Sequence, residues 1–382
     1  MELRRRTVAT LVVVSVVVAG AFVVLLARAP ELYTVTVLPS LRGLNMVPHS
    51  ISDRGQVVGI AGPDSGVYHL FCWDREKGMQ DLGPVCNNQL DNNDAGQIVG
   101  TMPDPNGKDQ AFLWDPDRGR VLLGTLGNSG STALAVNNRG QVVGNSFFPS
   151  GERSGRDWVH AFLWDQAGGM RDLGTLGGQA STAYGITDSG RVFGVRVSVQ
   201  DGRHIHQRCC WETIGVMTSE MLPLGPFFFR TNSKGCTVGK YDSDEGGPHI
   251  VLWRKDTGLR RLFPCKPDSR DVQMTALVVN DVNQVAYTYS GVYRQNRPSR
   301  LPRFIDRLLE PGAKSYLWDP KRGKVPLGRY TPRGLRNLEV RDINNRGDIL
   351  AEAHQRNGDA RAVLLEPIPS RWADSGRLPG GQ

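Results

Sequence analysis

This sequence lacks the motifs that identify several common enzyme classes. It has no Gly-x-Ser-x-Gly nucleophile elbow, no Walker phosphate loop and no His-Glu-x-x-His metalloprotease helix, and the spaced Asp box of sialidases is also missing. Cysteine is scarce as well, because six cysteines in 382 residues are too few for a disulfide scaffold. The 45 glycines have no three-residue period, which excludes collagen. What remains is a turn-rich globular chain that we expect to be all-β.

A strong charge of one sign is also missing from most of the chain. The formal net charge is +8, but residues 286–336 hold twelve Lys or Arg and only three acids. The rest of the chain is therefore close to neutral, and its charge gives no argument for a nucleic-acid partner. We predict no such partner.

Charged residues are absent from Thr7 to Ala27, a run made almost wholly of Val, Leu and Ala. As a helix this run would be about 30 Å long, the thickness of a bilayer core. We therefore predict one N-terminal helix over residues 7–27, acting as a transmembrane anchor or a signal segment. Residues 1–6 carry three arginines, and such a basic flank stays in the cytoplasm. The predicted location is the cell membrane, with a single pass and the C-terminal part outside the cytoplasm, or secretion if a signal is cleaved near Ala27–Ala29.

Internal repetition is the strongest feature of the rest of the chain. A phrase of the type Asn-Asp-x-Gly-Gln-Val-Val-Gly recurs seven times. Its copies are Ser52–Gly59, Asn93–Gly100, Asn137–Gly144, Asp188–Gly194, Ser233–Gly239 and, more diverged, Asn280–Ala286 and Asn344–Leu350. A Phe-Leu-Trp phrase alternates with it, most clearly at His160–Asp165, and a Met-x-Asp-Leu-Gly phrase such as Met170–Gly174 closes the unit.

The pattern within each unit predicts a propeller blade. The turn glycines of the first five copies are 41, 44, 50 and 45 residues apart, which leaves room for four short strands. Glycine supplies the positive φ of a tight hairpin. Neighbouring strand residues point to opposite faces, yet Phe162, Leu163 and Trp164 are all apolar, so both faces must be covered. A four-stranded sheet covered on both sides by copies of itself is a β-propeller blade.

The two ends of the repeat region indicate how the propeller closes. The seventh unit stops after its third strand, where Pro367 and Pro369 follow. A matching strand occurs at the other end, over Tyr33–Leu38. We therefore predict seven blades over residues 33–368, closed by the N-terminal strand so that no edge stays open, and a flexible tail over 369–382.

The repeat phrases also carry a family resemblance. The stretches that resemble the bacterial extracellular HAF-repeat family are His160–Asp165 with Gly169–Gly178, and Gln110–Asp115 with Leu123–Gly127. The resemblance covers roughly residues 33–366 and is strongest in the first four units. It implies an exported bacterial protein with propeller-like repeats, and it brings no catalytic residues.

Cysteines and histidines are the candidates for a disulfide and a metal site. Cys72 and Cys86 lie on the third and fourth strands of one unit, so they are our first choice for a disulfide outside the cytoplasm. His204, His206 and Cys210 fall on one face of an extended chain and offer the N and S ligands that suit zinc or copper. The alternative is an ordinary blade-edge segment in which the thiols fill core positions.

An acidic segment gives a weaker signal for calcium. Asp242–Gly246 has the first acids of a calcium loop but lacks the third acid and the distal Glu. A solvated blade loop explains it better. Calcium and zinc are therefore secondary alternatives to our prediction that the protein has no cofactor.

The sixth unit carries the one large insertion, at about residues 290–313, and it is basic and proline-rich. Long loops often carry function. A basic loop outside the membrane suits an envelope protein, an acidic glycan or anionic lipid headgroups as partner. The predicted partner-binding residues are Arg294, Arg297, Arg300, Arg303 and Arg307. The alternative is a solvated insertion that the fold tolerates.

These patterns predict a membrane-tethered, extracytoplasmic propeller that acts as a binding or scaffold module rather than as an enzyme. One alternative is a hydrolase or lyase that acts on glycan in the axial channel. It would require two carboxylates or a metal at the axis. Another alternative is a purely structural envelope protein.

Overall fold

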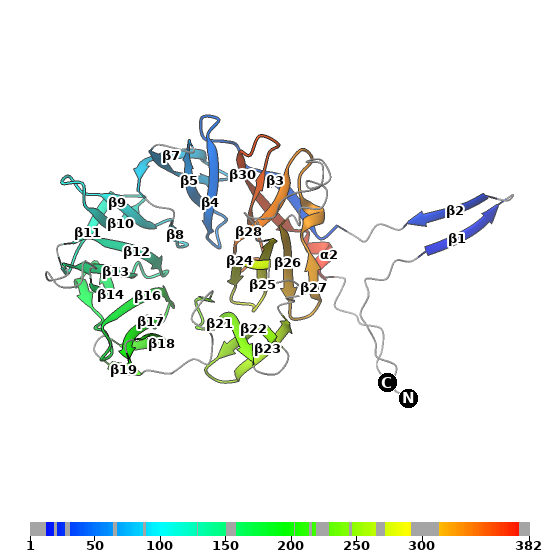
Figure 1. The fold of residues 1–382 in the computed structure, drawn as a ribbon. Helices are drawn as coiled ribbons and strands as arrows, with labels where there is room; N and C mark the ends of the chain where they lie inside the picture. Colours follow the sequence, from blue (N-terminus) through cyan, green and yellow to red (C-terminus); the bar gives the residue numbers. More distant parts are fainter. Residues whose placement is uncertain are drawn as a thin grey trace, which may run out of the picture. The chain divides into compact units, whose positions relative to one another are not determined.

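A computed structural model of the chain has seven four-stranded antiparallel sheets arranged as blades in a ring (Figure 1). The predicted all-β, seven-bladed propeller is therefore confirmed. The propeller unit spans Val35–Glu366, and the residues on either side of it form a second unit. The structure describes residues 13–18, 21–26, 31–63, 67–86, 89–127, 129–149, 158–201, 203–213, 216–218, 229–243, 247–264, 272–291 and 313–373.

The strands of the first four blades follow the chain order from the inner strand outward. Blade 1 has β4 (Asn45–Ile51), β5 (Val57–Gly62), β6 (Tyr68–Asp74) and β7 (Gly78–Val85). Blade 2 has β8 (Asp91–Asn92), β9 (Ile98–Pro103), β10 (Asp109–Asp115) and β11 (Gly119–Gly124). Blade 3 has β12 (Ser131–Val136), β13 (Val142–Phe148), β14 (Trp158–Asp165) and β15 (Gly169–Asp172). Blade 4 has β16 (Ala180–Ile186), β17 (Val192–Gln200), β18 (Arg203–Thr213) and β19 (Val216–Thr218).

The last three blades continue the pattern, except at the outer strand of blade 7. Blade 5 has β20 (Phe229–Thr231), β21 (Thr237–Ser243), β22 (Gly247–Arg254) and β23 (Gly258–Pro264). Blade 6 has β24 (Val272–Val279), β25 (Val285–Gly291), β26 (Lys314–Asp319) and β27 (Gly323–Pro326), followed by the 3-10 turn η1 (Gly328–Tyr330). Blade 7 has β28 (Arg336–Ile343), β29 (Ile349–His354), β30 (Ala360–Pro367) and, as its outer strand, β3 (Tyr33–Val37).

Glycine is needed at two positions of each well-preserved repeat, for two different reasons. Gly140 closes the hairpin between β12 and β13 with a φ of +72°, a conformation that residues with a Cβ rarely adopt. Gly144 lies within β13, where a Cβ would come 1.9 Å from the carbonyl oxygen of Thr132 on β12. The first glycine therefore makes the turn and the second lets the two strands approach.

The core lies between the blades. Phe162 packs with Val99 and Leu113 of blade 2, whereas its neighbour Leu163 packs with Val192 and other residues of blade 4. Both side chains are almost fully buried. Adjacent residues of one strand thus cover opposite neighbours, which explains why the third strand of each blade is apolar on both faces.

Buried asparagines at the inner turns tie the blades together. The Asn344 side-chain amide, for example, donates to the Ser52 carbonyl oxygen at 3.0 Å, which links blade 7 to blade 1. The equivalent donors in other blades are Asn93, Asn137, Asn232 and Asn280, each bonded at 2.9 Å to the backbone of the next blade. Ser52 and Thr187 occupy this position in blades 1 and 4, and their short hydroxyl side chains carry no amide to make the link.

The second unit contains the one α-helix of the described residues, α2 (Pro369–Ala373). The Trp372 indole donates to the Leu32 carbonyl oxygen at 2.9 Å, and its ring meets Tyr33 edge-on at a centroid distance of 5.6 Å. The beginning of the predicted flexible tail is therefore ordered by packing against the segment that precedes the propeller.

The predicted N-terminal helix over 7–27 is not found in the described part of that segment. β1 (Val13–Val18) and β2 (Ala21–Leu26) are strands of an antiparallel pair, with Val13 opposite Leu26. Valine is stiff at χ1 and favours strands over helices, which explains the difference. Within the described residues no helix has both the length and the apolar character needed to cross a membrane. The anchor or export role of this segment stays a prediction.

Candidate functional site

The inner strands of all seven blades line an axial channel of about 520 Å³. Each blade contributes one residue from the same repeat position, five residues before the turn glycine or, in blade 6, its equivalent Asn283. We call these residues the channel ring: Ser50, Asp91, Ala135, Gly185, Arg230, Val278 and Asp342. Because the seven members occupy equivalent places, their differences define the chemistry of the channel.

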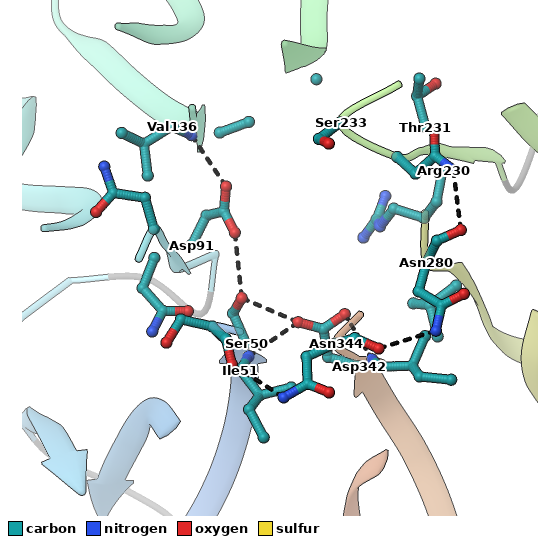
Figure 2. A pocket seen from close by; sticks show the side chains of 18 of the residues that line it. Ser50, Ile51, Asp91, Val136, Arg230, Thr231, Ser233, Asn280, Asp342 and Asn344 are labelled. Atoms are coloured by element: carbon teal, nitrogen blue, oxygen red, sulfur yellow. Dashed lines mark hydrogen bonds between the residues drawn. The ribbon is translucent and has the colours of Figure 1, made fainter. Parts of the chain in front are cut away.

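The channel ring is polar on one side and small or apolar over much of the other. Asp342, Ser50 and Asp91 come from three consecutive blades and are joined by hydrogen bonds (Figure 2). Arg230 comes from blade 5, is exposed, and points into the open centre of the channel (Figure 2). The members from blades 3, 4 and 6 carry no polar side chain. The channel ring therefore presents acids and one cation from different blades.

Two carboxyl groups share the hydroxyl of Ser50. The Ser50 Oγ lies 3.1 Å from Asp91 Oδ1 and 3.0 Å from Asp342 Oδ2. A hydroxyl has a single proton to donate, so it serves only one of two ionised carboxylates. The second contact becomes favourable when the other carboxyl is protonated and donates to Ser50. The geometry thus indicates that Asp91 and Asp342 hold a proton between them.

The electrostatics agree with a shared proton. Burial raises the pKa of Asp342 to about 6, and the nearby charge of Asp91 adds to the rise, while backbone N–H donors from Ile51 and Ile343 oppose it. Burial also raises the pKa of Asp91, against the N–H of Val136, the Ser50 hydroxyl and the charge of Arg230. The two groups titrate as a coupled pair, so below about pH 6 the pair retains a proton.

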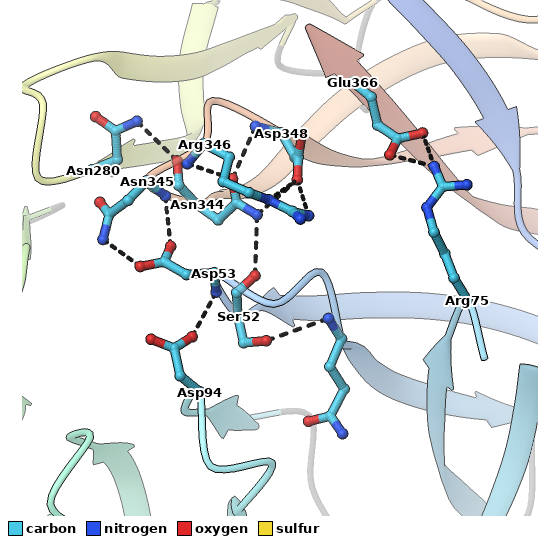
Figure 3. Close-up of polar contacts among 11 residues, drawn as sticks. Ser52, Asp53, Arg75, Asp94, Asn280, Asn344, Asn345, Arg346, Asp348 and Glu366 are labelled. Carbon is cyan, nitrogen blue, oxygen red and sulfur yellow. Dashed lines mark hydrogen bonds and ion pairs between the residues drawn. The ribbon is translucent and has the colours of Figure 1, made fainter. Parts of the chain in front are cut away.

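The turns after the inner strands form a second ring at one end of the channel. We call it the turn ring, and its members are Asp53, Asp94, Asn138, Asp188, Ser233, Asp281 and Asn345. The backbone N–H of Asp53 donates to Asp94 Oδ1 at 2.8 Å, and that of Asn345 donates to Asp53 Oδ1 at 2.7 Å (Figure 3). The five remaining links run Asp94 to Asn138, Asn138 to Asp188, Asp188 to Ser233, Ser233 to Asp281 and Asp281 to Asn345. The circuit is closed, and four of its members are acids.

One histidine in the channel wall is poorly matched to its surroundings. Both ring nitrogens of His49 are buried and lack a hydrogen-bond partner among the described residues. Burial, followed by the charge of Arg341, lowers the pKa of His49 to about 3, so its ring is neutral at physiological pH. It stands six residues before the turn glycine, a position that other blades fill with leucine at Leu90, Leu134 and Leu277.

The channel ring is the feature that sequence reasoning missed. The predicted enzyme alternative required two carboxylates or a metal at the axis, and two carboxyl groups, those of Asp91 and Asp342, do meet there. The signal was present, because the residue five positions before each turn glycine changes from Ser to Asp, Arg, Ala or Gly while the following turn repeats. Only the fold shows that this position faces the axis.

The predicted Cys72–Cys86 disulfide is absent, because both thiols are free, with Cys72 buried and Cys86 exposed. The strand register gives the reason. Cys72 stands opposite Gln80, whereas Cys86 follows Val85, which stands opposite Tyr68 at the other end of β6. Four residues along a strand span about 13 Å, and a disulfide needs Cα atoms within about 7 Å.

The predicted metal ligands His204, His206 and Cys210 all lie on β18, but they do not form one site. The four residues from His206 to Cys210 span about 13 Å along a strand, too far for both to bind one ion. Cys210 is buried, and its Sγ accepts a hydrogen bond from Arg191 at 3.1 Å. Among the described residues, no group of three His, Cys, Asp or Glu side chains is arranged to hold a metal.

The remaining predicted sites fall outside the described residues. All five arginines of the insertion lie between positions 292 and 312, which the structure does not describe. The same is true of the last three residues of the calcium-like segment Asp242–Gly246. These two predictions are therefore untested.

Comparison with known proteins supports the fold. No protein-family model and no curated protein matches the chain. Among solved structures, the chain is similar to the β-propeller domain of the Trilobed protease from Pyrococcus furiosus, with a TM-score of 0.55 and 9% identity over 84% of this chain and 93% of that one. It is also similar to puromycin hydrolase (TM-score 0.56, 13% identity, 88% of this chain and 53% of that one). Oligogalacturonate lyase in complex with manganese is a third match, with a TM-score of 0.50 and 12% identity over 90% of this chain and 98% of that one.

The chain spans about half the length of the puromycin hydrolase that it matches. At these low identities the similarity shows the propeller fold alone. The HAF-repeat resemblance stays a prediction.

Proposed function

We propose that this protein is a ligand-binding propeller, held outside the cytoplasm by residues 7–27, that takes a small polar molecule into its axial channel. The observation that supports this most strongly is the channel ring. A repeat architecture with no ligand has no reason to place Asp91, Asp342 and Arg230 at equivalent positions where other blades have Ala, Gly or Val. A cavity of about 520 Å³ is within the usual size range of small-molecule sites.

Binding is favoured over catalysis because the two carboxyl groups are already held by the protein. Asp342 Oδ2 accepts from Ser50 and from the Ile51 N–H at 2.9 Å, and its Oδ1 accepts from the Ile343 N–H at 2.8 Å. Asp91 Oδ2 accepts from the Val136 N–H at 2.9 Å. Groups fixed in this way are suited to recognition, whereas a nucleophile or a general acid needs an oxygen aimed freely at its substrate.

The test is a binding screen with the full-length protein in lipid nanodiscs. The probes are oligogalacturonates, unblocked dipeptides and glucosamine, each measured by isothermal titration calorimetry. We expect one class to bind and Arg230→Gln to weaken its affinity by about tenfold or more. Arg118→Gln, an exposed arginine outside the channel, is the matched control and should leave affinity unchanged. If no probe binds, the proposal fails and a purely structural envelope protein becomes the favoured interpretation.

A glycan-acting hydrolase or lyase is the second candidate, supported by the Asp91–Asp342 pair. Both carboxyl oxygens lie about 3 Å from one hydroxyl, so they are no more than about 6 Å apart, near the ~5–5.5 Å of a retaining glycosidase. Ser50 fills the space between them, which argues against this reading. New reducing ends or unsaturated products from envelope glycan, formed by the wild type but not by Asp342→Asn, would make the enzyme reading the better one.

The basic insertion is proposed as a separate contact surface for an acidic partner in the envelope. Its support is the sequence alone, since five arginines occur within residues 294–307. Charge reversal at all five, followed by cross-linking in the native membrane, tests it. Retention of the same captured partner by the reversed variant would exclude this surface.

A further inference from the structure

Charges of opposite sign face one another through the open space of the channel. Arg230 projects into it from β20, and the Asp91–Ser50–Asp342 group lies on the inner strands of blades 2, 1 and 7 (Figure 2). The remaining channel ring members are Ala135, Gly185 and Val278. At Gly185 an added Cβ would have only Thr231, at 4.0 Å, within contact range, so that side of the channel is open.

The acid pair has room for another donor. Each carboxylate oxygen can accept about two hydrogen bonds. Asp91 accepts from the Ser50 hydroxyl and from the N–H groups of Val136 and Asn92. Asp342 accepts from the same hydroxyl and from the N–H groups of Ile51 and Ile343. About one acceptor position is therefore left on each carboxyl group. A primary ammonium would supply three donors and a positive charge in the place where the pair otherwise needs a shared proton.

The guanidinium of Arg230 has the complementary preference. Its planar fork of N–H groups matches the two oxygens of a carboxylate. Its exposure to the channel leaves it accessible to a ligand. The four acids of the turn ring add a negative potential at one end of the channel, which attracts a cationic group to that entrance.

We infer that the channel binds a small zwitterion, specifically a short peptide with free ends, whose ammonium meets Asp91 and Asp342 and whose carboxylate meets Arg230. This inference rests on the proposed ligand-binding function and names its ligand class. The proton balance follows directly. Below about pH 6 the pair holds one proton, and the incoming ammonium replaces it, so one proton passes to the buffer for each ligand bound.

The experiment is calorimetric titration of the full-length protein in nanodiscs with dialanine, N-acetyl-dialanine and dialanine amide. At pH 5.5 we expect dialanine to bind about tenfold or more tightly than either blocked form. Repeating the titration in two buffers of different ionisation enthalpy should give most of one proton released at pH 5.5. It should give close to none at pH 7, where the pair is largely ionised and the amino end of dialanine, with a pKa near 8, is still protonated.

Two variants assign the two ends of the ligand. Asp342→Asn should lose the preference for a free amino end and keep that for a free carboxyl end, and Arg230→Gln should do the reverse. Asp117→Asn and Arg118→Gln, exposed residues outside the channel, are the matched controls. Because Arg230 is exposed in the channel, its substitution should leave the fold intact. The Arg230→Gln variant therefore still tests the inference if the Asp342 variant folds poorly.

The outcomes separate the inference from the proposed function. Equal affinity for blocked and free dialanine overturns the zwitterion. Binding of an oligogalacturonate in the channel, sensitive to Arg230→Gln, without any binding of dialanine, keeps the proposed function and also overturns the zwitterion. Absence of binding by every probe overturns both.

Discussion

The turn ring and the channel ring lie next to each other in the same seven blades and behave in opposite ways. In the turn ring every blade supplies Asp, Asn or Ser, and each member bonds the next around a closed circuit. In the channel ring, five residues before each turn glycine, the blades supply seven members that range from glycine to arginine. The repeated turn residues link the blades into a ring, whereas the residues that differ between blades form the candidate site.

The difference has a physical origin. A link between blades works only if each blade presents the same donor and acceptor at the same height, so its residue types are constrained in every copy. A residue that faces the open channel need not bond a neighbouring blade, so its residue type can differ from blade to blade. Asp91, Arg230 and Asp342 use that freedom, and their charges are costly to place in a narrow channel unless they are matched by a partner.

Removing one inter-blade link should give the largest effect. In Asn344→Ala the Ser52 carbonyl and the Asp348 backbone N–H, both bonded by the buried Asn344 side chain, lose their partner. We expect the free energy of unfolding to fall by about 3 kcal/mol, because buried polar groups are left unsatisfied. Urea denaturation measures it, with Arg356→Ala at an exposed turn as a control expected to change by less than about 0.5 kcal/mol. A loss as small as that of the control would show that the asparagine links do not stabilise the ring.

The shared proton of the channel ring should appear as a pH dependence. The pKa of Asp342 is raised to about 6, so folding favours its protonated form. Its contribution to stability is complete below the ordinary pKa near 4 and is lost as the pH rises through about 6, a change on the order of 2 kcal/mol. Asp342→Asn should lack this decline. The difference between wild type and variant, followed by urea denaturation from pH 4 to 7, checks it; a constant difference would contradict the shared proton.

The substitution His49→Leu tests whether this departure from the repeat lowers the stability of the fold. Leucine fills the equivalent position at Leu90, Leu134 and Leu277, and His49 has two unpartnered buried nitrogens. We expect the variant to gain about 1–2 kcal/mol at pH 7. Because the pKa of His49 is lowered to about 3, its wild-type penalty grows as the pH falls below 6.5, and the variant should lose less stability in acid. Thermal melts at pH 7 and 4 test both statements, and a destabilised variant would point to a role for the imidazole.

Adding a missing link should give the smallest effect. Thr187 accepts from the Arg191 N–H through its hydroxyl, as the asparagines do through their side-chain oxygen, but it lacks their amide. Thr187→Asn should keep that bond and add one to the Asn232 carbonyl of blade 5, a gain of about 1 kcal/mol. Thr187→Val, which removes the acceptor, should instead lower the melting temperature. If both variants melt alike, the amide link contributes nothing at this position.

Much of the fold could be predicted from sequence because its causes are local. The turn glycines, the strand glycines and the apolar Phe-Leu-Trp phrase each follow from the conformation or burial of one short segment, and they recur in most of the seven units. The predicted disulfide, in contrast, depended on the register between two strands. Cys72 and Cys86 were placed on neighbouring strands, but which residues stand opposite each other in β6 and β7 depends on the length of the hairpin and on the bulge within it.

The sequence by itself determined a seven-unit, all-β architecture, since a periodic pattern of turns and two-sided strands has few other ways to bury its apolar residues. Only the tertiary structure decided which side chains meet at the axis. Ser50 and Asp342 are 292 positions apart, and no local pattern relates them. They meet because blade 7 packs against blade 1, so the site is a property of the ring rather than of any repeat within it.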